Sequence, residues 1–238
     1  MTERAMVIGA SSGIGEALAR KLAAEGYEVG LTARSVDKLE AIAESLPTKT
    51  YVARMDVTET DAAQEAFTEL ADAMGTVDVV VVNAGVGPEN PDLEWEPERD
   101  TIDTNVRGFT ALAVAAMDHF EQQGHGQLVG VSSVASYVGS SRVPAYYASK
   151  AYVSNYLDGL RYKSRHLDAD ITVTTVEPGF VDTDLAGGEF WMCSPETAAE
   201  LIHEAIEEKK RQQFVTKRWR LVALALTLLP DLLKRRLF

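Results

Sequence analysis

Short runs of consecutive apolar residues alternate along this chain with longer segments in which apolar residues recur every three or four positions. Continuous apolar runs rich in valine are typical of strands that are buried on both faces of a parallel sheet. Seven such runs predict strands at Ala5–Gly9, Glu28–Thr32, Thr50–Met55, Val77–Val82, Gln127–Ser132, Ile171–Val176 and Gln213–Val215.

The segments between these runs have the periodicity of amphipathic helices. Within Ile14–Glu25 one stripe is apolar and is formed by Ile14, Ala17, Leu18 and Leu22. Further helices are predicted over Glu59–Met74, Pro97–Gln122 and Ala145–Leu167. Regular alternation of strands and helices with short connections indicates an α/β fold, a single-domain Rossmann-type doubly wound sheet of about seven parallel strands flanked by helices. We therefore expect one domain over residues 1–208, followed by a C-terminal tail over residues 209–238.

The charge balance restricts the classes of partner. The 238 residues include 23 Lys and Arg against 36 Asp and Glu, a net charge of −13, and 46% are hydrophobic, which is enough for a sizeable core. An acidic chain is unsuited to nucleic acid, because the phosphate backbone needs a basic face. Cys193 is the only cysteine and the four histidines are scattered, so neither a disulfide nor a metal site is expected. No secretory signal is visible at the N-terminus, which predicts a cytoplasmic protein.

The tail differs from the rest of the chain in charge. Residues 209–238 contain nine basic residues and one acid, a net charge of +8 that leaves −21 for residues 1–208. Leu221–Leu229 is apolar except for Thr227, but nine helical residues span only about 14 Å of a hydrocarbon core of roughly 30 Å, which excludes a transmembrane helix. Two alternatives stay open. Residues 217–238 lie in a membrane interface, or the tail packs on a partner subunit or over a substrate pocket.

Glycines follow the first predicted strand directly. In such a turn one glycine permits the tight reversal, one lets a pyrophosphate approach the backbone, and one lets the helix pack closely on the strand. The helix that follows presents unpaired N–H groups to phosphate. The loop is therefore predicted to bind a dinucleotide through Gly9, Ser11, Ser12, Gly13, Ile14 and Gly15.

The GxxxGxG spacing of this loop, with Asn83-Ala84-Gly85 after the fourth strand and Tyr146-x-x-x-Lys150 later, resembles the short-chain dehydrogenase/reductase family. The resemblance covers essentially the whole chain. It implies an enzyme that interconverts a carbonyl and an alcohol with NAD(P), assembled as a homodimer or homotetramer. It also implies that further positions hold the cofactor: Asp56 and Val57 at the adenine, Asn83, Ala84 and Gly85 beside the loop, Tyr146 and Lys150 in the catalytic helix, and Pro178, Gly179, Val181 and Thr183 at the nicotinamide.

The residue after the second strand bears on the choice between NADP and NAD. An acid there would accept a hydrogen bond from the ribose of NAD, whereas the 2′-phosphate of NADP needs a cation. The sequence has Arg34 at this point and no acid until Asp37, which favours NADP, with Ser11 and Ser35 as hydroxyl donors. Ser12 stands where many NADP-using relatives have a second basic residue, so NAD is kept as the alternative cofactor.

Four residues form the predicted catalytic set. Tyr146 and Lys150 lie four apart on a predicted helix and so project from one face, where an ammonium would lower the pKa of the phenol. By resemblance, Ser133 holds the substrate oxygen, with Ser132 as the alternative because adjacent residues of an extended segment face opposite ways. Asn105 is predicted by the same resemblance to hold a water that links Lys150 to solvent.

The substrate is predicted to be hydrophobic. Apolar residues are concentrated where the resemblance places the substrate, at Val138, Val143, Phe180, Leu185, Phe190, Trp191 and Met192. These residues fit a pocket for a small hydrophobic ketone, aldehyde or alcohol, and ordinary packing of a lid is the alternative interpretation. Two other functions are considered, a peripheral membrane reductase of lipid or isoprenoid ketones and a module that senses NADP(H) without chemistry.

Overall fold

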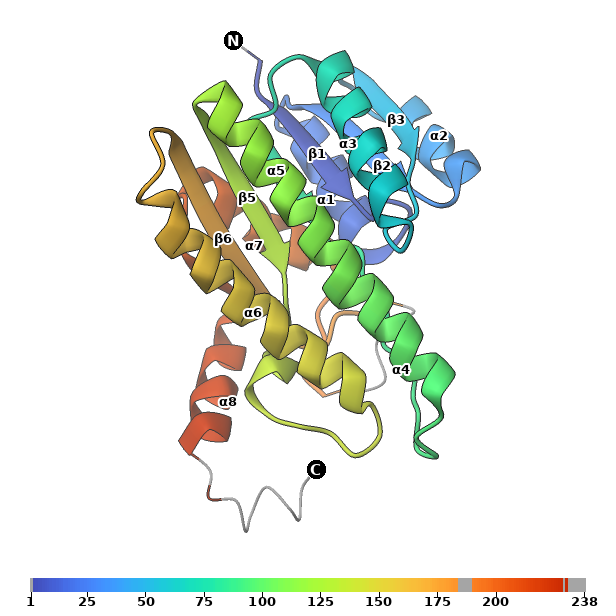
Figure 1. The fold of residues 1–238 in the computed structure, drawn as a ribbon, viewed down its shortest axis with the longest axis vertical. Helices are drawn as coiled ribbons and strands as arrows, with labels where there is room; N and C mark the ends of the chain where they lie inside the picture. Colours follow the sequence, from blue (N-terminus) through green and yellow to red (C-terminus); the bar gives the residue numbers. More distant parts are fainter. Residues whose placement is uncertain (1, 184–189, 229, 231–238) are drawn as a thin grey trace.

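A single sheet of parallel strands forms the centre of the molecule, with helices on both faces (Figure 1). The structure is a computed structural model that describes residues 2–183, 190–228 and 230. The strand order is β3-β2-β1-β4-β5-β6-β7, which confirms the predicted Rossmann-type sheet of seven parallel strands. Its strands are β1 (Arg4–Ile8), β2 (Glu28–Ala33), β3 (Thr50–Arg54), β4 (Val79–Val82), β5 (His125–Val131), β6 (Asp170–Pro178) and β7 (Gln212–Val215).

Two layers of helices bury the two faces of this sheet. One apolar core lies under α1 (Gly13–Ala24), α2 (Val36–Glu44) and α7 (Pro195–Glu207), and the other under α3 (Thr60–Met74), α5 (Phe109–Gln123) and α6 (Pro144–Ser164). In β1, Ala5 and Val7 belong to the first core whereas Met6 and Ile8 belong to the second, and all four are fully buried. Burial on both faces is the reason why this strand is a continuous apolar run.

The structure corrects several predicted boundaries. The predicted helix Pro97–Gln122 consists of three parts, namely α4 (Trp95–Ile102), a π-helical segment η1 (Asp103–Gly108) and α5. The π-helical segment covers only six residues, which is too short a stretch for apolar periodicity to distinguish it from the α-helices on either side. Helices α2 and α7 were not predicted at all, and the predicted strand Ile171–Val176 extends to Asp170–Pro178 in β6.

The C-terminal segment begins inside this fold. β7 pairs in parallel with β6 and is the edge strand on that side of the sheet. The first residues after position 208 therefore belong to the domain. Helix α8 (Lys217–Leu228) follows and packs against β7 and against η2 (Val134–Tyr137), a short 3-10 helix after β5. None of the helices within the described ranges is long and apolar enough to cross a membrane.

The strand order reverses between β1 and β4. The chain leaves β1 toward β2 and β3 on one side, whereas β4 to β7 continue the sheet on the other. Ligands of open α/β sheets bind at the point where the order reverses, outside the carboxyl ends of the strands. The loops after β1, β4, β5 and β6 carry most of the predicted site residues to this edge.

Candidate active site

The glycine loop after β1 has a backbone that excludes side chains. Gly9 and Gly13 have φ of +89° and +56°, which is left-handed backbone that favours glycine. A Cβ at Gly15 would lie 2.0 Å from the carbonyl oxygen of Gly9. Ser12 occupies the N-cap position of α1 without a side-chain cap hydrogen bond, so the first N–H groups of that helix remain available to an anion. These features fit the pyrophosphate of a dinucleotide.

The loop after β4 is joined to the glycine loop by Asn83. The side chain Nδ2 of Asn83 donates to the carbonyl oxygen of Gly9 at 2.8 Å. The backbone N–H groups of Asn83 and Ala84 both donate to the carbonyl oxygen of Ile8, at 3.0 and 2.9 Å. Asn83 therefore sets the shape of the glycine loop, a role that spacing alone did not indicate.

The loop after β6 approaches the glycine loop from the other side. A Cβ at Gly13 would lie 3.0 Å from Cγ2 of Thr183, so residues 170 positions apart border the same space. Val181 is buried, and its carbonyl oxygen accepts a hydrogen bond from the hydroxyl of Thr183 at 3.3 Å. The structure therefore brings the predicted phosphate loop and the predicted nicotinamide loop together.

At the other end of the predicted cofactor site, Arg34 is exposed just beyond β2 and lies near Asp56. Burial opposes ionisation of Asp56, but hydrogen bonds from Thr58 and the positive charge of Arg34 outweigh it and hold the pKa of the carboxyl below its usual value. Val57, the other residue predicted at the adenine, is buried. Gly108 packs directly against it, since a Cβ at Gly108 would lie 2.5 Å from the carbonyl oxygen of Val57. The exposed guanidinium is thus available to a phosphate.

The structure distinguishes the two candidate serines after β5. Ser133 Oγ donates to the carbonyl oxygen of Pro178 at 3.3 Å and hydrogen-bonds the phenol of Tyr146. Ser132 Oγ points toward α6, where it donates to the carbonyl oxygen of Lys150 at 2.8 Å and lies 2.7 Å from Ser154 Oγ. Ser133 is therefore the serine beside the predicted catalytic tyrosine.

Tyr146 and Lys150 both lie on α6, as their spacing predicts, but one electrostatic prediction is wrong. Burial raises the pKa of Tyr146, and the hydrogen bond with Ser133 only partly offsets this effect. Lys150 Nζ donates to the carbonyl oxygen of Val131 at 3.0 Å and lies 5.7 Å from the centre of the Tyr146 ring. Burial lowers the pKa of Lys150 to about 8. Burial, and not the ammonium, has the largest effect on the pKa of this phenol.

Asn105 lies in the π-helical segment η1 and is almost fully buried. Its Oδ1 accepts from the N–H of Val86 at 2.9 Å, and its Nδ2 donates to the carbonyl oxygen of Val86 at 2.7 Å and to Ser149 Oγ at 3.0 Å. A Cβ at Gly85 would lie 3.4 Å from both Asn105 Oδ1 and Lys150 Nζ, so these two side chains border the same residue. The side-chain amide of Asn105 thereby holds the loop after β4 next to Lys150.

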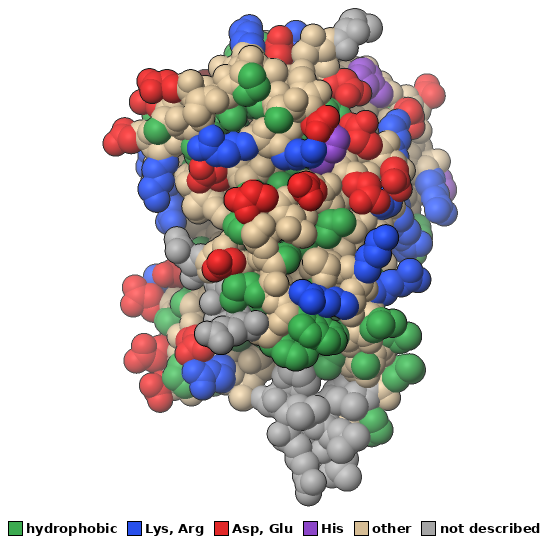
Figure 2. All heavy atoms as spheres, turned by 180° about the vertical axis from the view of Figure 1, so that it is seen from behind, with side chains coloured by type: hydrophobic (Ala, Val, Ile, Leu, Met, Phe, Trp, Pro, Cys, Tyr) green, Lys and Arg blue, Asp and Glu red, His purple; other side chains and the backbone are tan. Residues whose placement is uncertain are grey.

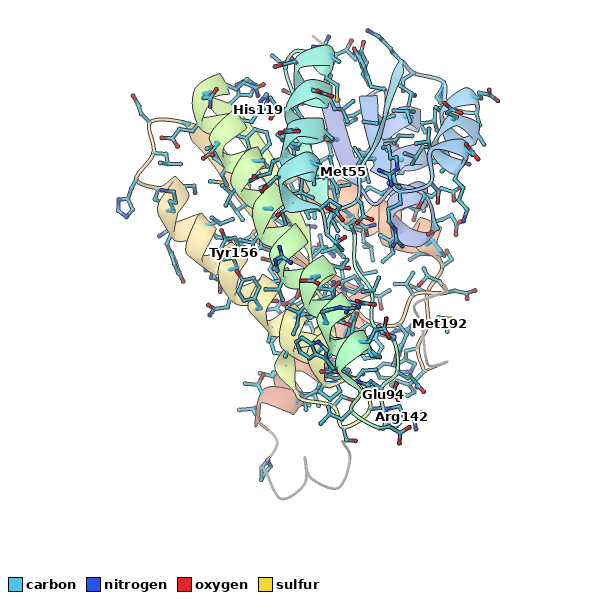
Figure 3. The ribbon with its side chains drawn as sticks, turned by 45° about the vertical axis from the view of Figure 1, so that its right-hand side comes forward. Met55, Glu94, His119, Arg142, Tyr156 and Met192 are labelled. Atoms are coloured by element: carbon cyan, nitrogen blue, oxygen red, sulfur yellow. The ribbon has the colours of Figure 1, made fainter. Side chains whose placement is uncertain are left out.

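Two loops, after β4 and after η2, are joined to each other by a hydrogen bond and an ion pair. The N–H of Asn90 donates to the carbonyl oxygen of Arg142 at 2.7 Å, and Arg142 pairs with Glu89 at 2.7 Å. Met192 lies at this same end of the molecule, together with Glu94 and Arg142 and far from His119 (Figure 3). Leu185, one of the predicted pocket residues, lies outside the described residues.

Trp219 of α8 is a site residue that the sequence did not reveal. It is 4% exposed, and a Cβ at Gly179 would lie 2.0 Å from both Cε2 and Nε1 of its indole. Its ring also packs edge-on against Phe180, Phe190 and Trp191. A tryptophan in a basic tail carries no signal of such a contact, because 40 residues separate it from Gly179.

Comparison with known proteins agrees with this geometry. The family described as "short chain dehydrogenase" matches residues 3–191. An uncharacterized oxidoreductase of Myxococcus xanthus is 39% identical over 186 residues, which cover 76% of this chain and 73% of that protein. An uncharacterized oxidoreductase of Mycobacterium tuberculosis is 32% identical over 98% of this chain and 96% of its own. A 3-oxoacyl-[acyl-carrier-protein] reductase of Staphylococcus aureus is 34% identical over 78% of this chain and 77% of its own.

Two solved structures have the same architecture. An alcohol dehydrogenase from the archaeon Thermococcus sibiricus, complexed with 5-hydroxy-NADP, has a TM-score of 0.80 and 27% identity, and the match covers 90% of this chain and 95% of that one. A short chain dehydrogenase/reductase from Burkholderia phymatum, in complex with NAD, has a TM-score of 0.87 and 20% identity over 94% of this chain and 92% of that one. The two neighbours carry different nicotinamide cofactors.

Proposed function

The chain belongs to the short chain dehydrogenase family and is an oxidoreductase that uses a nicotinamide cofactor, and from this premise we propose that it interconverts a hydrophobic carbonyl and its alcohol with NADP. The observation that carries the proposal is the contact between Ser133 and Tyr146, with Lys150 buried one helical turn beyond the tyrosine. Two hydroxyl groups in contact at the carboxyl edge of the sheet are suited to hold one substrate oxygen.

The proposed chemistry assigns one task to each of these side chains. The nicotinamide, when bound, supplies the hydride in reduction and takes it up in oxidation. Ser133 Oγ and the phenol of Tyr146 donate to the carbonyl oxygen, and the raised pKa of the phenol keeps its proton in place until the alkoxide develops. Tyr146 then gives up its proton to that oxygen. Lys150 returns a proton to Tyr146, and Asn105 holds the loop after β4 beside it.

The proposed preference for NADP rests on Arg34. Its guanidinium is exposed at the end of β2, and a cation at this place suits the 2′-phosphate that distinguishes NADP from NAD. Replacing Arg34 by Ala is expected to raise the Kd of NADPH by roughly tenfold or more, since charge-assisted hydrogen bonds are worth about 1.5–3 kcal/mol. The Kd of NADH is expected to change less than twofold. Equal weakening of both cofactors would contradict the preference.

The proposal of a hydrophobic substrate rests on the aromatic residues of the loop after β6. Phe190 and Trp191 stack at 4.5 Å and stay exposed, at 59% and 44% of their surface. Two exposed aromatic rings beside the predicted nicotinamide loop are suited to an apolar chain or ring. One relative of this chain is named as a reductase of 3-oxoacyl groups, and a keto group on an apolar chain is consistent with this lining.

The test is consumption of NADPH by the wild type and by Tyr146→Phe over a panel of polar and long-chain ketones and aldehydes. Removal of the phenol proton is expected to lower kcat by about 10²–10⁴ while the Kd of NADPH stays unchanged. Turnover of the long-chain carbonyls should exceed that of the polar ones. Full turnover by Tyr146→Phe would refute the assigned role of the phenol.

A further inference from the structure

The outer face of α8 is apolar and exposed. Leu221, Leu224 and Leu228 are exposed at 69%, 58% and 73% of their surface, while Trp219 and Ala223 point inward and are buried. Positions spaced by three and four residues share one side of a helix, so the three leucines form a continuous stripe. We call Leu221, Leu224 and Leu228 the leucine stripe. Isolated exposed leucines are ordinary, but a stripe of them on one helix marks an interaction surface.

Basic residues flank the leucine stripe. Lys217, Arg218 and Arg220 are exposed in the first turn of α8, and the helix contains no acidic residue. Figure 2 shows hydrophobic side chains next to Lys and Arg side chains at this end of the molecule. Arg218 is partly committed to the protein itself, because its Nη2 donates to the carbonyl oxygen of Trp191 at 2.7 Å. Lys217 and Arg220 are thus the other exposed cations beside the stripe, and Lys217 also lies near enough to Glu204 to help lower the pKa of that carboxyl.

The distribution of charge indicates what kind of surface binds the leucine stripe. Residues 1–208 have a net charge of −21, so an anionic surface repels most of the molecule. Helix α8 is attracted instead, because it carries three basic residues and no acid. An apolar stripe with cations at one end is the pattern of a helix that lies in a membrane interface. A second copy of the chain fits less well, since three leucine side chains cover far less than the roughly 800 Å² per partner that a stable interface buries.

We propose that α8 binds the surface of a membrane that contains anionic lipids. The leucine stripe enters the boundary between headgroups and acyl chains, and Lys217 and Arg220 pair with lipid phosphates. This binding requires no catalytic activity, so it stands independently of the reaction proposed above.

The inner face of α8 gives such binding a consequence for the active site. Trp219 packs on the loop after β6, and an apolar pocket of about 440 Å³ lined by Val138, Pro144 and Tyr147 adjoins η2, which α8 also contacts. A helix held at the lipid surface therefore brings the aromatic loop to the lipid, where a membrane-dissolved carbonyl is concentrated. This consequence rests on the proposed function.

The experiment is flotation of the full-length protein with vesicles of phosphatidylcholine alone and with vesicles that also contain phosphatidylglycerol. The wild type is expected to float with the anionic vesicles and to stay in solution with the neutral ones. Leu221→Gln with Leu224→Gln should weaken anionic binding at least about tenfold, because each leucine loses its transfer to an apolar medium. Lys217→Gln and Arg220→Gln should each weaken it roughly fivefold.

Leu93→Gln is the matched control. Leu93 is exposed to 67%, almost as much as Leu221, but it lies between the acidic residues Asp92 and Glu94, so its replacement should leave flotation unchanged. Point variants are preferred to truncation because Lys234, Arg235 and Arg236 follow in the sequence and attract anionic lipid themselves. All variants change exposed residues, and equal melting temperatures verify that they fold.

Three outcomes overturn the proposal. One is failure of the wild type to float with anionic vesicles, and another is an equal loss in Leu93→Gln and in the leucine-stripe variant. The third is unchanged flotation of the leucine-stripe variant together with a smaller mass in light scattering, which would assign the stripe to a second copy of the chain. Flotation is measured without substrate, so a failed carbonyl assay does not affect the test of lipid binding. Likewise, a failed flotation assay does not affect the test of the proposed reaction.

Discussion

Replacement of Gly179 by Ala tests whether α8 supports the predicted nicotinamide loop. The backbone of Gly179 is not left-handed, so an added methyl group causes no dihedral strain. The methyl carbon would lie 2.0 Å from both Cε2 and Nε1 of Trp219 and 2.3 Å from Cδ2, whereas ordinary contact begins at 3.4 Å. The indole would have to move by more than an ångström, and Phe180, Phe190 and Trp191 pack around it. The effect of the substitution is therefore steric alone.

The magnitude follows from the packing of that cluster. Overpacking of a filled core costs about 1–3 kcal/mol, and Gly179→Ala should fall within this range, because Trp219 is buried whereas Phe190 and Trp191 beside it are exposed and can move. At roughly 2–4 °C per kcal/mol for a chain of this length, we expect the melting temperature to fall by about 2–12 °C. The loop must move with the ring, so the Kd of NADPH should rise as well.

A double-mutant cycle with Trp219→Leu isolates the contact. Leucine lacks the two indole atoms nearest to Gly179, so in that background Gly179→Ala should cost less than about 1 kcal/mol. Gly139→Ala is the control, since a Cβ there meets nothing within 4 Å. Unfolding in urea and binding of NADPH are measured for each variant. An equal cost of Gly179→Ala with and without the indole would refute the steric explanation.

Three further variants test other contacts. Ser133→Ala should lower kcat by at least about tenfold. Ser132→Ala should keep kcat and lose about 1–2 kcal/mol of stability, because it removes the hydrogen bonds of Ser132 Oγ with the Lys150 carbonyl and with Ser154 Oγ. Gly15→Ala should weaken NADPH binding and cost more than about 3 kcal/mol, since its Cβ meets backbone oxygen at 2.0 Å. In the wild type the free energy of unfolding should rise by about 3 kcal/mol between pH 8 and roughly 10.4. Lys150→Met should abolish this rise, which is measured by unfolding in urea at several pH values.

The sign of that last effect follows from where the proton is bound. The folded protein holds the Lys150 proton with a pKa of about 8, and the unfolded chain holds it with a pKa of roughly 10.4. Below pH 8 both states are protonated and the folded state bears the full cost of a buried charge. Between the two pKa values the unfolded chain binds more protons, so stability rises with pH. An unchanged pH profile in Lys150→Met would contradict the assignment.

The local pattern was sufficient to predict the sheet and the glycine turn after β1. The four buried residues of β1 and the glycines after it depend on neighbours in the sequence, and the structure places them as expected. The sequence does not predict the π-helical segment around Asn105, because six residues are too few for apolar periodicity to separate it from the neighbouring α-helices. The local pattern also failed to predict α2 and α7, which are regular helices.

The parts of the site that sequence did not predict depend on long-range contacts. The hydrogen bond from Asn83 to Gly9 spans 74 residues, and the contact of Trp219 with Gly179 spans 40. The pKa of Tyr146 was predicted in the wrong direction because its spacing from Lys150 says nothing about burial. Residue types and spacing indicate which side chains lie close together. Their pKa values depend on how far the fold buries them, which the sequence does not show.

Burial also favours one direction for the proposed reaction. It raises the pKa of Tyr146 and lowers that of Lys150, so each group is pushed toward its neutral form. A neutral phenol is ready to donate a proton, as carbonyl reduction requires, whereas alcohol oxidation needs a phenolate to accept one. We therefore expect the rate of reduction to be highest below pH 8 and to fall as Lys150 loses its proton, and the rate of oxidation to rise over the same range. Rates of both directions on one carbonyl–alcohol pair, measured across pH 6–10, check this. Two parallel profiles would show that the protonation of this pair does not determine the direction.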